Sequence, residues 1–242
     1  MRYGIFSDIH SNLEALDSVL DSYKHEAIDR YFCIGDIVGY AANPNECIEL
    51  IRSKNVVCVA GNHDWASVGL FALDNFNPLA KEAVIWTRTR LNSDNIDYLQ
   101  SLDLIYSDDD FTMVHGTLDR PQEFNYMSGG YTAWDSFEAM DNHICFVGHT
   151  HVPEIYIRKP DDYLESRKED ILSIEDDCSY IVNVGSTGQP RDGDRRAAYC
   201  IYDTQKRKLE IRRIDYDFLQ TKRKITDAGL PEFLAQRLEI GR

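Results

Sequence analysis

The sequence has few basic residues for its length and no long apolar run. Its 242 residues include 26 lysines and arginines against 41 aspartates and glutamates, which gives a formal net charge of −15. A field of that sign repels nucleic-acid backbones and anionic membranes, so we expect neither a nucleic-acid scaffold nor a membrane among its partners. No apolar stretch approaches the ~18 residues of a membrane span, and the first residues do not have the pattern of a signal peptide.

Paired cysteine motifs are also absent. The six cysteines are scattered singly, mostly inside apolar runs, and no C-x-x-C pair occurs. This distribution is typical of reduced core residues and not of a disulfide framework. We therefore expect a cytoplasmic protein.

The remaining composition is that of a globular protein with a sizeable core. Hydrophobic residues make up 43% of the chain and charged residues 28%, which is ordinary for such proteins. The length fits most simply a single α/β domain over residues 1–242, although two small domains would also fit. The sequence contains no internal repeat, no linker and no indication of the oligomeric state.

Short apolar runs alternate with amphipathic segments in the first part of the chain. Strands are predicted at 2–7, 31–34 and 56–59. The helix after the first strand should begin with a capping box formed by Ser11 and Glu14, and the helix after the second should begin at Asn43-Pro44. This order at this spacing indicates parallel βαβ units.

The rest of the chain is richer in strands. Further strands are predicted at 111–114, 144–147, 154–159, 180–184, 197–203 and 207–214, and further helices start at Asn77-Pro78, at a cap on Ser93 and near 131. We interpret 117–143 as a wall or lid over the candidate site. The acidic stretch 160–178 should form an exposed hairpin or loop, and 216–242 a helical tail.

The predicted strands share one feature, which is that many of them end in a carboxylate, an amide or an imidazole. The tetrapeptide Gly61-Asn62-His63-Asp64, for example, should lie in the loop after the strand at 56–59. Five of the seven histidines occupy such positions. The candidates for ligands are Asp8, His10, Asp36, Asn62, His63, His115, His149 and His151. Ligands of open α/β sheets bind at this edge.

These eight side chains predict a metal centre. A lone histidine at a strand end is more often structural, but a set of this size exceeds the needs of one ion and suits two, with a carboxylate bridging them. Because the set contains no thiolate, its chemistry suits manganese, iron, zinc or a similar divalent ion and not a zinc-finger or iron–sulfur site.

The motifs Asp8-x-His10, Gly35-Asp36-x-x-Gly39, Gly61-Asn62-His63-Asp64, His115-Gly116 and Gly148-His149-Thr150-His151 occur in this order. As a set they resemble the calcineurin-like metallophosphoesterase superfamily. The stretch 183–194 and the tail motif 228–231 look like its small bacterial and archaeal branch, whose members are often labelled predicted phosphoesterases or diadenosine tetraphosphatase-like. The resemblance covers nearly the whole chain and implies a four-layer α/β/β/α sandwich with two mixed sheets. One departure is Thr117-Leu118, where relatives commonly have serine and proline.

The resemblance also implies roles for individual residues. The first ion would be held by Asp8, His10, Asp36 and His151, and the second by Asp36, Asn62, His115 and His149, with Asp36 bridging. His63 would give a proton to the leaving group, with Asp64 orienting it.

Two residues are expected to contact the substrate phosphate, Asn62 and Arg191. The planar guanidinium of Arg191 matches phosphate oxygens, and the glycine-bounded loop around it allows it to point inward. The alternative for Arg191 is a surface salt bridge with Asp192 or Asp194.

Together these residues predict a metal-dependent phosphoesterase. Two divalent ions bring about +4 against −2 from Asp8 and Asp36, so the pocket would be positive although the protein is acidic. The expected substrate is a small phosphomonoester or phosphodiester, with a nucleotide-type substrate favoured, attacked directly by metal-bound hydroxide. The alternatives are a metal-holding scaffold that has lost catalysis, a protein phosphatase and a metal-dependent amide or lactam hydrolase.

Overall fold

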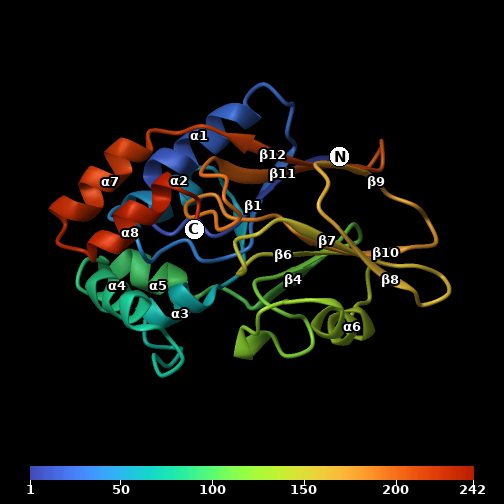
Figure 1. Cartoon of the computed structure of the whole chain (residues 1–242), viewed down its shortest axis with the longest axis horizontal. Coiled ribbons are helices and arrows are strands. Elements are labelled where there is room, and N and C mark those ends of the chain that lie inside the picture. The colour runs from blue at the N-terminus through green and yellow to red at the C-terminus, as the bar shows by residue number, and fades with distance from the viewer.

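The structure, a computed structural model, describes residues 1–242 and contains two six-stranded sheets (Figure 1). The first sheet runs in the order β3 (Val57–Cys58), β2 (Arg30–Cys33), β1 (Arg2–Phe6), β11 (Ala197–Asp203), β12 (Lys208–Ile214) and β9 (Ile171–Ser173). The second runs in the order β4 (Ile105–Ser107), β5 (Thr112–Val114), β6 (Ile144–Val147), β10 (Ser179–Asn183), β7 (Glu154–Arg158) and β8 (Leu164–Arg167). Both sheets are mixed, because β1 is parallel to β2 but antiparallel to β11, and β10 is parallel to β6 but antiparallel to β7.

Eight α-helices and two short 3-10 segments complete the chain. The helices are α1 (Leu13–Tyr23), α2 (Pro44–Ser53), α3 (Asn62–Ser67), α4 (Pro78–Arg88), α5 (Ser93–Gln100), α6 (Gly130–Glu138), α7 (Phe218–Asp227) and α8 (Glu232–Gln236). The 3-10 segments are Pro121–Glu123 and Arg237–Glu239. The longest helices, α1 and α4, have 11 residues each, and no helix is both long and apolar enough to cross a bilayer.

The apolar residues divide the molecule into four layers. Tyr3 and Ile5 of β1 pack between the two sheets, whereas Phe6 packs against α1 on the outer side, as the two-residue period of a strand requires. Helices α1, α2 and α5 cover the outer face of the first sheet, and α6 covers that of the second (Figure 1). The predicted α/β/β/α sandwich with two mixed sheets is confirmed.

Two predicted helix caps are wrong by one residue. Asn12 and not Ser11 caps α1, and its side-chain oxygen accepts the Ala15 amide at 3.2 Å. Ser11 is held in a left-handed conformation (φ 59°), with its own amide bonded to the Ile37 carbonyl at 2.9 Å. Asn92 and not Ser93 caps α5. Asparagine and serine are equally good caps, so composition alone does not choose between neighbouring positions.

The tetrapeptide Gly61-Asn62-His63-Asp64 was expected in a loop, and this prediction is wrong. Helix α3 begins at Asn62, directly after Gly61 at its N-cap. The Asp64 carboxylate accepts the Gly61 amide at 3.0 Å, which satisfies one of the free donors at the helix start. The helix is therefore what fixes the direction of the Asn62 and His63 side chains.

The acidic stretch 160–178 is not an isolated hairpin or loop. Its first half supplies β8, which pairs with β7, and its second half supplies β9, which pairs with β12 in the other sheet. Strand β4 was also not predicted. These edge strands lack a clear apolar alternation, so backbone pairing and not side-chain pattern determines them.

The tail 216–242 is helical, as predicted. Helices α7 and α8 pack with Tyr40 and α4 in a separate apolar cluster on one side of the sandwich (Figure 1). The tail therefore supports the loop after β2, which carries Asp36.

The loop after β10 approaches β1 so closely that a side chain at Gly188 has no space. A Cβ atom built there would lie 1.8 Å from the Ile9 carbonyl oxygen, a backbone atom that cannot move aside. We expect Gly188→Ala to lower the free energy of unfolding by roughly 1–3 kcal/mol, measured by chemical denaturation. Gly130→Ala is the matched control, since nothing lies within 4 Å of the added atom, and it should stay within about 0.5 kcal/mol of the parent. Equal stability of the two variants would contradict this packing.

Candidate metal centre

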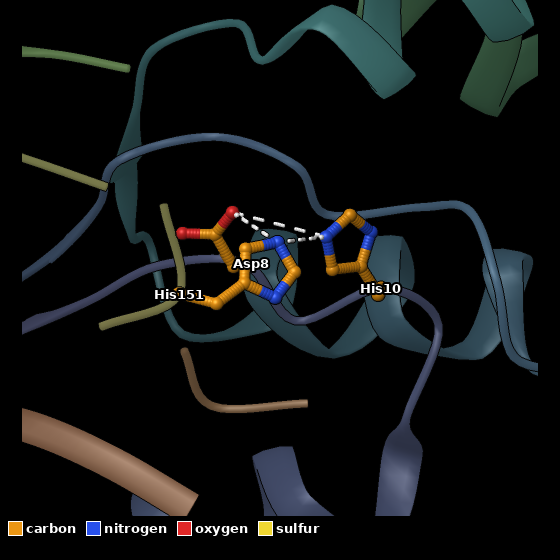
Figure 2. A group of neighbouring side chains, drawn as sticks. All are labelled: Asp8, His10 and His151. Carbon is orange, nitrogen blue, oxygen red and sulfur yellow. Dashed lines mark hydrogen bonds and ion pairs between the residues drawn. The ribbon is translucent and has the colours of Figure 1, made fainter. Parts of the chain in front are cut away.

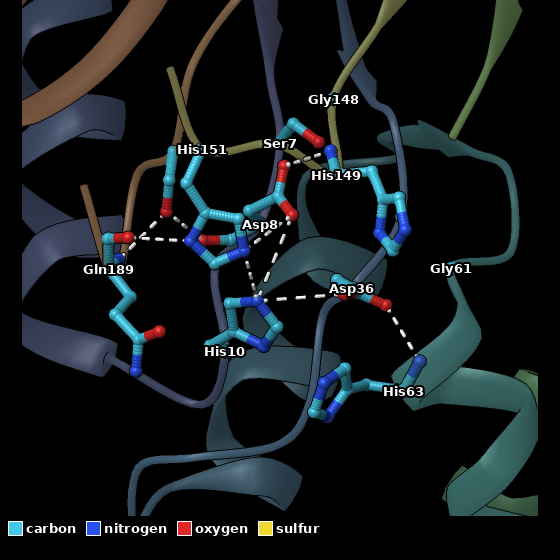
Figure 3. A network of polar contacts seen from close by, with 12 residues as sticks. Ser7, Asp8, His10, Asp36, Gly61, His63, Gly148, His149, His151 and Gln189 are labelled. Carbon is cyan, nitrogen blue, oxygen red and sulfur yellow. Dashed lines mark hydrogen bonds and ion pairs between the residues drawn. The ribbon is translucent and has the colours of Figure 1, made fainter. Parts of the chain in front are cut away.

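The eight predicted strand-end residues lie together and are buried, with exposed fractions of 9% or less. Asp8 and His10 follow β1, Asp36 follows β2, and Asn62 and His63 open α3 after β3. His115 follows β5 of the second sheet, and His149 and His151 follow β6. The centre thus forms where the carboxyl ends of parallel strands from both sheets meet (Figure 3).

The first group of side chains consists of Asp8, His10 and His151 (Figure 2). The His151 Nε2 atom lies 3.2 Å from Asp8 Oδ1 and 3.1 Å from the Nε2 atom of His10. The Nδ1 atoms of both rings donate to backbone carbonyls, His10 to Val38 at 3.1 Å and His151 to Gln189 at 2.6 Å. In the neutral rings both Nε2 atoms are then acceptors that face each other, an arrangement that a cation between them stabilises.

The second group consists of Asp36, His115 and His149. The His115 Nε2 atom lies 3.3 Å from Asp36 Oδ2 and 3.1 Å from His149 Nδ1, and the His115 Nδ1 atom donates to the Ile34 carbonyl at 2.7 Å. The His149 ring stacks on Tyr126, with centroids 3.9 Å apart. Asn62 has a buried side-chain oxygen without a hydrogen-bond partner.

Asp36 connects the two groups. Its Oδ1 atom accepts the backbone amide of His63 at 2.8 Å, an interaction drawn in Figure 3. Its Oδ2 atom lies 3.5 Å from His10 Nε2 and 3.3 Å from His115 Nε2. One carboxylate oxygen is therefore anchored by the protein while the other faces both groups.

The protonation states suit metal binding. Burial lowers the pKa of His149 to about 3 and also lowers that of His10, so these imidazoles are neutral and have a free lone pair. Burial acts to raise the pKa of Asp8 and Asp36, but the neighbouring histidines hold both below the usual range. Burial also acts against a charge on His115, yet Asp36 raises its pKa to about 9, so this ring must lose a proton when it binds an ion. Ionised carboxylates, imidazoles and an amide oxygen are a fitting donor set for divalent transition ions.

Two further atoms support that fit. Asp8 Oδ1 and Asn62 Oδ1 are buried and accept no hydrogen bond. A buried acceptor without a partner is costly, and more so when it is charged. Both atoms are among the donors expected to hold ions, and a cation would supply the missing partner.

The backbone around the centre is strained. Five candidate ligands have left-handed conformations, namely Asp8 (φ 53°), His10 (φ 49°), Asp36 (φ 51°), His149 (φ 67°) and His151 (φ 62°). Each such residue costs on the order of 1–3 kcal/mol, and such conformations concentrate at functional sites. Main-chain hydrogen bonds between the loops after β1 and β2 hold Asp8, His10 and Asp36, including the Asp8 amide to the Gly35 carbonyl at 3.0 Å.

His63 lies beside the first group and does not bond to Asp64. Its ring is 4.8 Å from that of His10, 4.5 Å from Tyr40 and 5.0 Å from Phe76, and its buried Nδ1 atom has no partner. The Asp64 carboxylate instead accepts the Gly61 and Val38 amides. Adjacent helical residues point in different directions, so the expected orienting role of Asp64 is corrected to a structural one.

Arg191 does not form the surface salt bridge considered as its alternative. Asp192 pairs with Arg213, and Asp194 pairs with Arg196 at 2.6 Å. The Arg191 guanidinium donates to the Gln189 side chain at 2.8 Å and lies 5.7 Å from the Tyr40 ring centre. It is therefore a cation without a carboxylate partner beside the centre, and its charge adds to the lowering of the pKa of His63 and His151 by burial.

Two features of the site were not predicted from the sequence. They are a second half-buried arginine besides Arg191 and a set of aromatic residues. Arg237 in the tail pairs with no side-chain carboxylate but donates to the Arg242 main-chain oxygen, and its pKa is lowered to about 10 by burial and by the charge of Arg191. No motif indicated it. Next to His63 lies a cleft of about 110 Å³, lined by Tyr40, Asn62, His63, Phe71, Asn75, Phe76, Asn77, Ala80, Glu123, Phe124, Tyr126 and His149. A larger cavity of about 250 Å³ lies elsewhere, near β8 and β12, and contains none of the candidate ligands.

The segment 117–143 contributes one wall of this cleft. Glu123, Phe124 and Tyr126 line it, whereas α6 in the same segment packs on the outer face of the second sheet (Figure 1). The helix of the segment therefore belongs to the outer layer and does not cover the centre.

Comparison with known proteins gives concordant results. A family model described as the calcineurin-like phosphoesterase superfamily domain matches residues 1–207. An uncharacterized protein of Methanocaldococcus jannaschii is 41% identical over 242 residues, which cover 98% of this chain and 97% of that protein.

Two solved structures are similar over the whole length. A metallophosphoesterase from Sphaerobacter thermophilus is 39% identical, with a TM-score of 0.87 and coverage of 100% of this chain and 99% of that one. A hypothetical protein from Pyrococcus horikoshii is 19% identical, with a TM-score of 0.80 and coverage of 100% of this chain and 98% of that one. It shows the same fold.

The shared Asp36 oxygen leads to a prediction about metal content. Metal-reconstituted protein should contain two transition-metal ions per chain by elemental analysis. Asp36→Ala should weaken both sites, whereas Asn62→Ala should weaken mainly one, because Asn62 is expected to hold the second ion alone. Asp177→Ala is the control, since Asp177 lies in a separate and mostly exposed acidic cluster. One ion or none in the parent protein would disprove the two-ion centre.

Proposed function

The chain belongs to the calcineurin-like phosphoesterase superfamily, and we propose that it is a dinuclear metal-dependent phosphoesterase that hydrolyses a small phosphomonoester or phosphodiester. The observation that carries this proposal is the pair of buried ligand groups that share one oxygen of Asp36. Two-metal sites of this kind are suited to displacement at phosphorus. We favour a nucleotide-type substrate.

The proposed ligands follow from the two groups. Asp8, His10, Asp36 and His151 would hold one ion, and Asp36, Asn62, His115 and His149 the other. When bound, the ions supply positive charge for the phosphate oxygens and lower the pKa of a water molecule. Manganese, iron and zinc all suit this donor set.

Two further residues are proposed to act on the substrate. His63 would donate a proton to the leaving-group oxygen, since its ring lies at the border between the centre and the cleft. An anionic phosphate beside the ring raises its affinity for a proton. Arg191 would bind a phosphate oxygen with its unpaired guanidinium, and Asn62 would contact the same phosphate.

We also propose a cytoplasmic location and a small-molecule substrate. The six unpaired cysteines support a reducing compartment. The net charge of −15 disfavours nucleic acid and membranes as partners. The size of the cleft favours a small ester over a phosphoprotein.

Hydrolysis of bis-p-nitrophenyl phosphate by metal-free and metal-loaded protein tests the proposal. Turnover should require the ions and should be inhibited by inorganic phosphate more strongly than by a carboxylate analogue. Full metal content without turnover of any ester in a broad panel would instead indicate a scaffold without catalysis. Stronger inhibition by the carboxylate would indicate amide or lactam hydrolysis.

Loss of the His63 ring should slow the reaction in a way that depends on the leaving group. His63→Ala should lower kcat for an alkyl phosphate ester by roughly 10²–10⁴-fold, because a poor leaving group needs a proton. The loss should shrink for p-nitrophenyl esters, whose leaving group is already acidic. His143→Ala, at an exposed histidine, is the control. A His63→Ala variant with full metal content and the parent rate on the alkyl ester would refute this role.

Loss of the Arg191 guanidinium should weaken phosphate binding without loss of metal. A charge-assisted hydrogen bond is worth about 1.5–3 kcal/mol, so Arg191→Ala should lower kcat/KM by roughly tenfold to a hundredfold. Arg191→Lys should restore only part of the lost kcat/KM, because an ammonium lacks the planar fork of the guanidinium. Arg196→Ala, which removes the surface pair with Asp194, serves as the control from the same loop. Parent activity of Arg191→Ala on every ester would show that Arg191 does not contact the substrate.

A further inference from the structure

The cleft beside His63 has predominantly aromatic walls. Phe76 lies 5.0 Å from the His63 ring, and Phe71 lies 6.2 Å from Phe76 and 5.0 Å from Phe124. Tyr40 closes the side next to His63, with its ring 4.5 Å away. The rings come from three separate segments, which are the loop after β2, the loop between α3 and α4, and the segment after β5.

We propose that this cleft binds the base of a nucleoside leaving group. The inference rests on the proposed function, because it identifies the group on the far side of the bond that would be hydrolysed. His63 lies between the first ligand group and the cleft, with its ring 4.8 Å from His10 on one side and 5.0 Å from Phe76 on the other. A leaving-group oxygen beside His63 therefore has the phosphate site on one side and the aromatic walls on the other.

The size of the cleft fits one ring system. Pockets that enclose a whole drug-sized ligand measure roughly 300–1,000 Å³. The volume of about 110 Å³ is well below that range. The part of the cleft lined by Phe71, Phe76 and Phe124 can take a flat ring system, while the sugar and phosphate of the same molecule lie towards Asn62, His63 and His149.

The polar groups of the cleft distinguish a base from a plain aromatic ring. The exposed side-chain amide of Asn75 makes no hydrogen bond within the chain. Asn77 uses only its side-chain oxygen, which accepts the backbone N–H of Ala80 at 3.0 Å. The N–H groups of both amides are thus free at the rim. Bases are recognised by stacking on aromatic rings together with hydrogen bonds to their edges, and asparagine suits an adenine edge. A phenyl ring would leave these amides unused.

Phe71 is the position that tests the cleft without disturbing the centre. Its ring pairs with those of Phe76 and Phe124 and with no candidate histidine ring. The other rings are less suitable, because Phe76 contacts His63 and Tyr126 stacks on His149. Tyr163 is a matched control, since it is 59% exposed and does not line the cleft.

The experiment compares adenosine, ribose and phenol as ligands of the metal-loaded protein by calorimetry, since none has a phosphate to hydrolyse. Stacking of one base should make adenosine bind on the order of tenfold to a hundredfold more tightly than ribose or phenol. Phe71→Leu should remove most of this difference, and Tyr163→Leu should keep it. Asn75→Ala, at an exposed side chain, should weaken adenosine binding several-fold without affecting folding.

Three results would overturn the inference. They are equal affinities for adenosine and ribose, phenol binding as tightly as adenosine, and parent affinity for adenosine in Phe71→Leu. Turnover of β-glycerol phosphate, measured separately, distinguishes this failure from that of the proposed function. A protein that hydrolyses β-glycerol phosphate but does not prefer adenosine would refute the base site alone. A protein that binds adenosine but hydrolyses no ester would refute the proposed function alone.

Discussion

Buried lone pairs that face one another are the constraint on which the rest of this structure depends. Carboxylate oxygens of Asp8 and Asp36 and ring nitrogens of His10 and His151 converge, while the opposite edge of each of these rings is already bonded to a backbone carbonyl. Burying such acceptors without a partner costs several kcal/mol per charged group. Divalent cations remove that cost. The buried acceptors therefore suit the fold to ion binding, and we expect bound ions to stabilise the folded protein by mass action.

Both sheets and one distant loop are needed to hold this arrangement. The first sheet supplies Asp8, His10 and Asp36, and the second supplies the histidines that follow β5 and β6. The loop after β10 then joins them. Its Ser186 hydroxyl and Gly188 amide donate to the Asp8 carbonyl at 2.8 and 2.9 Å, and its Gln189 carbonyl accepts from His151. Because the ligands come from both sheets, shifting one sheet against the other would separate the two halves of the centre.

The sequence allowed the ligands to be predicted for a physical reason, whereas the four layers were expected from the family resemblance. Ligand identity depends on residue type at strand ends, and apolar alternation marks the strands, so Asp8, His115 and the other candidates could be found from pattern alone. The edge strands β8 and β9 could not, because backbone pairing forms them. The left-handed backbone of Asp36 is likewise invisible in a sequence, since hydrogen bonds between distant loops impose it. The resemblance implied that Asp64 orients His63, whereas helix geometry directs its carboxylate to the Gly61 amide. The aromatic cleft assembles residues from three segments and has no local signature.

Anomalous X-ray scattering from crystals of manganese-loaded protein is the most direct test of whether Asp36 bridges two cations. We expect two peaks about 3.5–4 Å apart, one beside Asp8, His10 and His151 and the other beside Asn62, His115 and His149, with Asp36 between them. A single peak, or peaks confined to the separate cluster of Glu175, Asp177 and Cys178, would contradict a bridging Asp36.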